Sequence, residues 1–368
     1  MTLQIFAADV PRFVGPAKRL LVEGQRTNSY RNPRGEGAGS GWPTYWGFGS
    51  ARGMALVSSE TITRDGRPGA RIRVAGTPTA GFTAISPEVA GVAAAAGQQW
   101  TNSTWCAQVA GEVAISMNPR TLPRDASNAV ISLGGNNLSA QVALTNTPQL
   151  IKHTPGVMPT NTANILLQFE FLGLTAGVPA DFTVDILGAQ MEMGAFASSL
   201  VLPAVGAPAI SSRAADLSTF VLPTAQAAQG TLVATMMLSQ AAPAAGSNGL
   251  LAIMGATDAD RFILRNAAGS SSISAIKRVA GATTGSATLG TMIPGTPFRV
   301  AVAWDATAYY ACLNGGAVLT IGGANPAVSQ IAIGQDGLTS GTAAFGEIGP
   351  LDLYPARLPD AALQTLTV

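Results

Sequence analysis

The sequence is poor in charged residues, and this shortage excludes two classes of function. Only 11% of its 368 residues are charged, against roughly 25% in an ordinary soluble domain, and the net charge is +1. Nucleic-acid binding depends on neutralising many phosphates, so we expect none here. No uninterrupted apolar stretch approaches the roughly 20 residues of a membrane-spanning helix, so we expect no contact with a membrane.

Histidine and cysteine are also scarce, which limits metal and nucleophilic chemistry. The chain has one histidine, His153, and two cysteines, Cys106 and Cys312. These are too few for a zinc cage within one chain. His153 lies in a turn-like stretch, residues 152–156, where an exposed loop position is expected. Both cysteines fall in strand-like runs, so the sequence predicts buried free thiols rather than a disulfide.

Motifs of the common enzyme classes are missing as well. The sequence contains no phosphate-binding GxxxxGK[ST] loop, no HExxH and no nucleophile elbow. Glycoside hydrolysis needs two carboxylates at a set separation. Glu347 and Asp352 do not have the required spacing, and Asp181 and Asp185 fall on the face of a strand that is expected to be in solvent. We therefore predict that the protein is not an enzyme and has no catalytic residues.

Alternating apolar and polar residues are the strongest structural signal in the chain. They occur over residues 165–172, 181–186 and 298–305, and this period of two is typical of strands with one buried face. Asn314-Gly315 follows another apolar run and favours a tight hairpin turn. The sequence thus predicts an all-β protein made of two tandem antiparallel β-sandwiches.

Composition divides the chain into four parts. Residues 1–26 hold one small apolar cluster, Leu20-Leu21-Val22, and are predicted to be an N-terminal attachment segment. Residues 27–204 form the first sandwich, residues 205–229 form a linker rich in Pro, Gly, Ala and Ser, and residues 230–368 form the second sandwich. A short C-terminal helix is expected over residues 359–366, where Pro359 and Asp360 favour a helix start.

Two sets of stretches carry a resemblance to known proteins. The first set is residues 10–13, 19–28, 31–37, 43–47, 188–199 and 213–216, and the second is residues 297–304, 313–316 and 353–360. The first set resembles a family of bacteriophage head-spike and tail-fibre proteins, which implies that the first sandwich is a jelly roll like those of carbohydrate-binding modules. The second set resembles a concanavalin-like, laminin-G-type domain, which is the fold implied for the second sandwich.

Aromatic residues are the candidate sugar contacts, because rigid flat rings match the apolar face of a pyranose. Trp42, Tyr45 and Trp46 form the densest aromatic cluster, in a segment rich in Gly and Pro. Core packing of Trp46 at a strand start is the alternative interpretation. Tyr309 joins the candidates because it and Tyr310 point to opposite faces of a strand, so one of them is exposed.

No cofactor is predicted, although a calcium ion is common in concanavalin-like folds. Calcium prefers hard oxygen ligands, and Asp258 and Asp260 are the best local pair. A loop whose acids merely face water is the alternative.

The resemblance implies a virion protein of a phage or gene transfer particle, assembled in the bacterial cytoplasm, that binds host surface polysaccharide during adsorption. It further implies contact with other virion proteins through residues 1–26 and a homo-oligomer, with a trimer favoured. One alternative is a purely structural decoration or adaptor protein of the virion, and another is a polysaccharide depolymerase.

Overall fold

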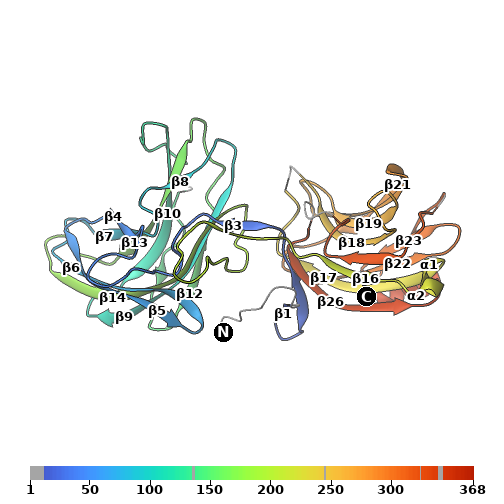
Figure 1. Cartoon of the computed structure of the whole chain (residues 1–368), viewed down its shortest axis with the longest axis horizontal. Helices are drawn as coiled ribbons and strands as arrows, with labels where there is room; N and C mark the ends of the chain where they lie inside the picture. Colours follow the sequence, from blue (N-terminus) through green and yellow to red (C-terminus); the bar gives the residue numbers. More distant parts are fainter. Residues whose placement is uncertain (1–11, 135–136, 244–245, 324, 339–342) are drawn as a thin grey trace. The chain divides into compact units, whose positions relative to one another are not determined.

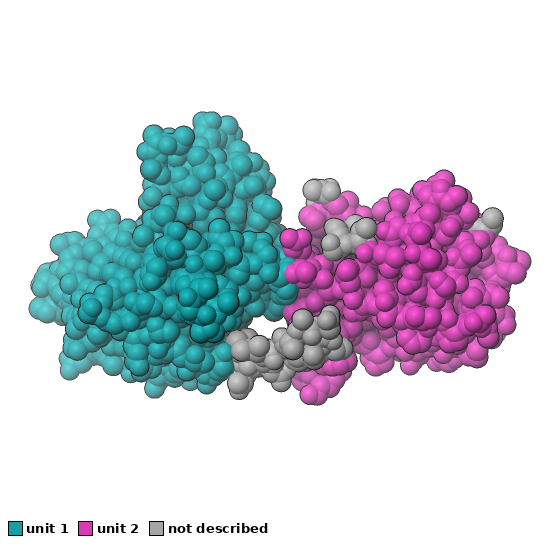
Figure 2. Space-filling model, in the orientation of Figure 1, with its two compact units in different colours: residues 1–5, 26–213 teal, residues 6–25, 214–368 magenta. Residues whose placement is uncertain are grey.

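The chain consists almost entirely of strands arranged in two compact units (Figure 1). The computed structural model describes residues 12–134, 137–243, 246–323, 325–338 and 343–368. Within these ranges the first unit holds residues 26–213, and the second holds residues 12–25 and 214–368 (Figure 2). Each unit contains two antiparallel sheets packed face to face, so the predicted all-β fold is confirmed.

The first unit packs a β13 sheet against a β14 sheet. The β13 sheet has the order β11 (Val142–Ala143), β10 (Ser116–Arg124), β13 (Asn164–Leu172), β7 (Phe82–Ser86) and β4 (Gly47–Ser50), and β8 (Val92–Ala93) also pairs with β13. The β14 sheet has the order β12 (Gln149–His153), β9 (Trp100–Gly111), β14 (Ala180–Met193), β6 (Arg67–Gly76) and β5 (Met54–Arg64). Phe171 and Phe182 meet between the sheets, with ring centroids 6.0 Å apart.

The second unit packs a β17 sheet against a β19 sheet. The β17 sheet runs β1 (Phe13–Val14), β2 (Arg19–Val22), β26 (Gly346–Tyr354), β17 (Gly230–Leu238), β22 (Phe298–Trp304), β23 (Tyr309–Leu313) and β24 (Leu319–Ile321). The β19 sheet runs β16 (Ser218–Val221), β25 (Gln330–Ile333), β18 (Asn248–Met254), β19 (Arg261–Asn266), β20 (Ser272–Val279) and β21 (Ala282–Thr291). The apolar faces of both sheets form one core.

Part of the predicted N-terminal segment forms strands of the second sandwich. Residues 1–11 lie outside the described residues, but β1 and β2 form a hairpin at the edge of the β17 sheet. Leu20 pairs with Ile348, and Val22, only 1% exposed, pairs with Gly346. A hairpin this small cannot bury its own apolar residues, so it completes the sheet of the second sandwich.

The predicted linker, residues 205–229, also belongs to the sandwiches. Its strand β15 (Ser211–Arg213) pairs with β3 (Arg26–Asn28) in the first unit, whereas β16 pairs with β25 in the second. The chain therefore forms β1 and β2 of the second sandwich first, then all strands of the first unit, and then the remaining strands of the second sandwich. In chain order, the first unit is an insertion between β2 and β16.

Smaller features agree with the sequence. Cys106 and Cys312 are buried free thiols. Helix α2 (Asp360–Leu366) follows Pro359 and buries Leu363 against the outer face of the β17 sheet, while α1 (Thr224–Ala227) is a single turn. Neither of the described helices has the length and apolar character needed to cross a membrane. Asn314 and Gly315 both have positive φ, as the predicted tight turn requires.

His153 is not the exposed loop residue that the sequence predicts. It ends strand β12, is only 9% exposed, and its Nε2 has no hydrogen-bond partner in the described protein. Burial lowers the pKa of His153, because the imidazolium form loses its hydration inside the sandwich.

A buried amide holds β3 against the closing strand of the first unit. Asn28 is fully buried, and its Nδ2 donates to the carbonyl oxygens of Ala189 and Val201, both at 3.1 Å. Its Oδ1 accepts hydrogen bonds from the backbone N–H groups of Tyr30 and Met191, also at 3.1 Å. Four backbone groups from three segments are thus satisfied by one side chain.

We predict that Asn28→Ala destabilises the first unit by roughly 3 kcal/mol, because it leaves buried backbone donors and acceptors without partners. Urea titration followed by circular dichroism measures the change. Gln229→Ala, which removes an exposed amide, is the control and should leave the midpoint within about 0.5 kcal/mol of the parent. Equal midpoints for both variants would contradict the role of Asn28.

The buried His153 predicts a pH dependence of stability. Because its folded pKa lies below the unfolded value of about 6.5, the unfolded state binds the proton more readily. Stability should therefore fall as the pH drops from about 6.5 towards the lower folded pKa. Melting temperatures at several pH values should show this slope in the parent and a weaker slope in His153→Gln. Parallel curves for the two proteins would show that the imidazole is not the cause.

Candidate functional site

The aromatic cluster predicted to bind sugar lies in the loop before β4, and one member belongs to the core. Trp46 is 4% exposed and its indole Nε1 donates to the carbonyl oxygen of Asn32 at 2.9 Å. A ring buried in this way cannot receive a sugar. The glycan-binding assignment of Trp46 is thus wrong, and the alternative of core packing is confirmed.

Trp42 and Tyr45 are half-buried and keep part of their surface in solvent. Trp42 packs edge to face on Phe48, with centroids 4.8 Å apart. The guanidinium carbon of Arg31 lies 3.6 Å from the centre of the Tyr45 ring, and Arg31 is itself paired with Glu88. One face of Tyr45 is therefore occupied, and Trp42 offers the freer edge.

Tyr309 is a core residue, which corrects its prediction as a sugar contact. It is 1% exposed and stacks on Phe262 with centroids 4.5 Å apart and planes 5° from parallel. Burial raises the pKa of its phenol. The alternation correctly placed Tyr309 and Tyr310 on opposite faces, but Tyr310 is the one on the outer face, beside Arg357.

The carboxylates proposed for calcium serve separate partners within the protein. Asp258 Oδ1 lies 3.2 Å from Nη1 of Arg261 and accepts the backbone N–H of Leu338, while Asp260 Oδ1 accepts the N–H of Ala280. Within the described ranges no three His, Cys, Asp or Glu side chains are grouped to hold a metal ion. Asp258 and Asp260 therefore both have partners within the protein, and nothing in the described part of the chain brings them together as a pair of ligands.

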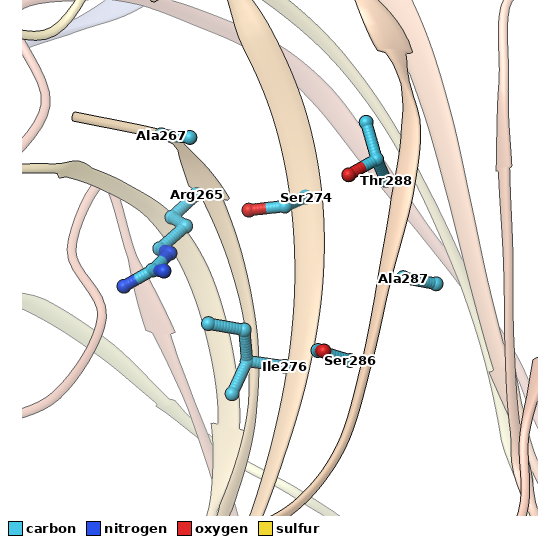
Figure 3. Close-up of a pocket in the computed structure, with 7 residues that line it drawn as sticks. All are labelled: Arg265, Ala267, Ser274, Ile276, Ser286, Ala287 and Thr288. Atoms are coloured by element: carbon cyan, nitrogen blue, oxygen red, sulfur yellow. The ribbon is translucent and has the colours of Figure 1, made fainter. Parts of the chain in front are cut away.

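A hollow of about 330 Å³ lies on the outer face of the β19 sheet. Antiparallel register sets Arg265 opposite Ser274, Ser274 opposite Thr288, and Ile276 opposite Ser286, so these side chains share one face. The alternating residues of β19 and β20 point into the core instead. The lining, drawn in Figure 3, consists of Arg265, Ala267, Ser274, Ile276, Ser286, Ala287 and Thr288.

The hollow presents hydrogen-bonding groups that the protein itself does not use. In the described chain, the Ser274 hydroxyl and the Arg265 Nε are buried without hydrogen-bond partners. Figure 3 shows the Ser274 hydroxyl directed to the side on which Arg265 lies. Buried polar groups are normally satisfied, so unpaired ones at a surface hollow are candidates for ligand contacts.

The chemistry of this lining suits a polyhydroxylated ligand. Arg265 supplies fixed donors, Ser286 and Thr288 are exposed hydroxyls that donate and accept, and Ile276 is an apolar floor for C–H groups. The residues that line the hollow include no carboxylate, so it lacks the acid pair of a glycosidase. The lining thus combines hydrogen-bonding groups with an apolar floor.

A second polar surface lies on the outer face of the β13 sheet in the first unit. Gln168 and Glu170 alternate with core residues on β13, as the sequence predicts, and Asn118 and Arg120 face them from β10. Arg120 Nη1 lies 2.8 Å from Glu170 Oε1, whereas the buried Oδ1 of Asn118 has no partner in the described protein. This surface is polar, but its charged members already satisfy each other.

The aromatic residues of the sequence do not point to the hollow, because none of its lining residues is aromatic. The only usable signal was the alternation of Ser272, Ser274 and Ile276 beside Arg265, and short hydroxyl side chains on a strand do not by themselves distinguish a binding face from a wetted face. The hollow depends on three strands in register, which a single-strand pattern does not reveal.

Comparison with known proteins gives low similarities. No protein-family model matches the sequence, and no curated protein matches it. Among solved structures, the chain is similar to the CBM40 of Ruminococcus gnavus IT-sialidase bound to α2,3-sialyllactose, with 18% identity, a TM-score of 0.32, and 38% of this chain and 83% of that one covered.

Two further solved structures are similar to a comparable degree. Trypanosoma rangeli sialidase with the inhibitor DANA has 17% identity and a TM-score of 0.30, covering 39% of this chain and 23% of that one. Sheep galectin-11 with glycerol has 13% identity and a TM-score of 0.27, covering 38% and 96%. These scores are too low to support a statement about the function of this chain.

The different positions of Trp46 and Trp42 predict different costs of truncation. Trp46→Ala should lose about 3–5 kcal/mol of stability, because it opens a core cavity and leaves the Asn32 carbonyl without its hydrogen-bond donor. Trp42→Ala should lose only about 1 kcal/mol, mainly its contact with Phe48. Urea titration of both variants checks the order, and a larger loss for Trp42 would reverse the assignment of core and surface.

Proposed function

We propose that this chain is a glycan-binding protein of a phage or gene transfer particle, located in the virion, that attaches the particle to host surface polysaccharide. The observation that carries the binding function is the hollow on the β19 sheet, with the unpaired Arg265 and Ser274 groups and the exposed hydroxyls of Ser286 and Thr288. Trp42 in the first unit is a second candidate contact. The protein binds its ligand without cleaving it.

The virion part of the proposal is supported by the resemblance of residues 19–28, 188–199 and 213–216 to phage spike and fibre proteins. A surface with few charges, wetted by Ser, Thr, Asn and Gln, suits reversible contact with sugars. Single sugar contacts are weak, so several copies on one particle would supply avidity. A homotrimer is the expected arrangement by analogy with fibres, and other virion proteins are its expected partners.

Filling the hollow tests the site directly. Ser286→Trp and Thr288→Trp place a bulky ring at exposed positions of an edge strand, so the fold should tolerate them. On an array, each variant should bind roughly 10-fold or more weakly to a glycan that the parent protein binds, because the ring displaces the ligand. Thr320→Trp, at an exposed position of the β17 sheet, is the matched control and should bind like the parent.

The array also decides between the proposal and its alternatives. Binding of the parent to no glycan or purified host polysaccharide would leave the decoration or adaptor role. Release of oligosaccharides from a bound polysaccharide would indicate a depolymerase. Mass spectrometry of purified particles from the source bacterium tests the location, and absence of the chain from every particle would refute it.

A further inference from the structure

Two arginines on the outer face of the β19 sheet have no acidic partner. Among the described ion pairs, Arg265 and Arg278 pair with no carboxylate, and the Nε of each is buried without a hydrogen bond. The arginines on the outer face of the β14 sheet behave differently: Arg64 and Arg71 pair with Asp185, and Arg73 pairs with Asp181. Arg124 also forms no ion pair in the described residues, so the feature that sets Arg265 and Arg278 apart is that both lie on one face of one sheet.

The register places the two arginines on one line along the outer face of β19 and β20, called the arginine track below. Arg265 faces Ser274, and Arg278 lies on the same face of β20 as Ser274 because the two positions differ by an even number. At about 3.3 Å per residue, the backbone positions of Ser274 and Arg278 are roughly 13 Å apart. The floor between them is apolar, formed by the buried pair Ile263 and Ile276.

The acidic groups around the arginine track are engaged elsewhere. Asp258 is held by Arg261 and by the N–H of Leu338, and Asp260 accepts the N–H of Ala280. Asp336 lies over Gly249, which is the strand neighbour of Arg265. None of the three forms an ion pair with Arg265 or Arg278 within the described residues, so both guanidinium groups remain available to an external anion.

We propose that this face selects acidic glycans: Arg265, with Ser274 and Thr288, binds one carboxylate or sulfate group, and Arg278 binds a second about two sugar units along the chain. The proposal rests on the proposed glycan-binding function and names its ligand class. A guanidinium group provides paired donors that match the geometry of carboxylate and sulfate oxygens. The hydroxyls of Ser286 and Thr288 and the Ile276 floor would then contact the sugar between the charges.

Biolayer interferometry with the full chain tests this selectivity. Immobilised polygalacturonate provides carboxylates, dextran sulfate provides sulfates, and dextran provides a neutral backbone, each at 50 and 300 mM NaCl. The parent should bind one or both acidic polymers at least 10-fold more tightly than dextran, and the affinity should fall with salt. The stronger of the two acidic signals identifies the anionic group.

Charge-removing variants locate the effect. Arg265→Gln and Arg278→Gln should each weaken binding to the acidic polymer by roughly 10-fold, as expected for the loss of one charge-assisted contact, and the double variant should weaken it further. Arg299→Gln, which removes one positive charge from the β17 sheet of the same unit, is the matched control and should retain parent affinity. Circular dichroism and melting temperatures verify that all variants are folded.

The outcomes separate this inference from the proposed function. Binding to dextran that equals binding to both acidic polymers overturns the acidic selectivity while glycan binding stands. An effect of Arg299→Gln as large as that of Arg265→Gln also overturns it, because net charge rather than this face would then be responsible. Binding to no polymer here, and to no glycan on the array, refutes both.

Discussion

The architecture depends on holding the point where the chain enters and leaves the first unit. That unit is inserted between two strands of the second sandwich, so its ends must stay together while the chain passes both ways. Strand β3 and strand β15 pair at this point, and the four hydrogen bonds of Asn28 attach β3 to the closing strand β14. A fully satisfied buried amide has a strict geometry, so it fixes the register of the closing strand as well as stabilising it.

Each unit has its own polar contacts near the residues where the chain crosses between the units. Arg26 forms an ion pair with the buried Glu192 at 3.4 Å, and Glu192 also accepts the backbone N–H of Ser198 at 2.7 Å. In the second unit, Glu23 pairs with Arg12, and its backbone N–H donates to Asp216 at 2.7 Å. These residues come from stretches far apart in sequence. Within each unit, these contacts hold the chain segments that enter or leave it.

The sequence predicted the local elements well and the long-range pairings poorly. Alternation in β13, β14 and β22 was sufficient to identify strands, because each buries one face whatever its neighbour. The segment Leu20-Leu21-Val22 was assigned to attachment because its partner, β26, lies more than 300 residues later in the chain. No local pattern contains that information.

The candidate site shows the same limit. Alternation places Tyr309 and Tyr310 on opposite faces of the strand, but the position of the second sheet decides which face is buried. Tyr309 faces that sheet and stacks on Phe262 in the core. Trp46 packs into the core, where the Asn32 carbonyl accepts its indole N–H, and spacing in the sequence does not reveal that contact. The hollow needs three strands in register and was not predictable from β20 alone.

The low charge of the chain makes the pairing of its few charges informative. Asp185 is completely buried and forms ion pairs with Arg64 at 2.9 Å and Arg71 at 2.7 Å. In the first unit, arginines thus neutralise a buried carboxylate. Removing one partner from such a cluster leaves an uncompensated charge, which explains why these arginines are bound to the protein itself. Arg265 and Arg278 carry the same side chain without that internal demand. Beside the apolar pair Ile263 and Ile276 they place positive charge that forms no ion pair within the described residues, an arrangement that the proposed acidic ligand would complement.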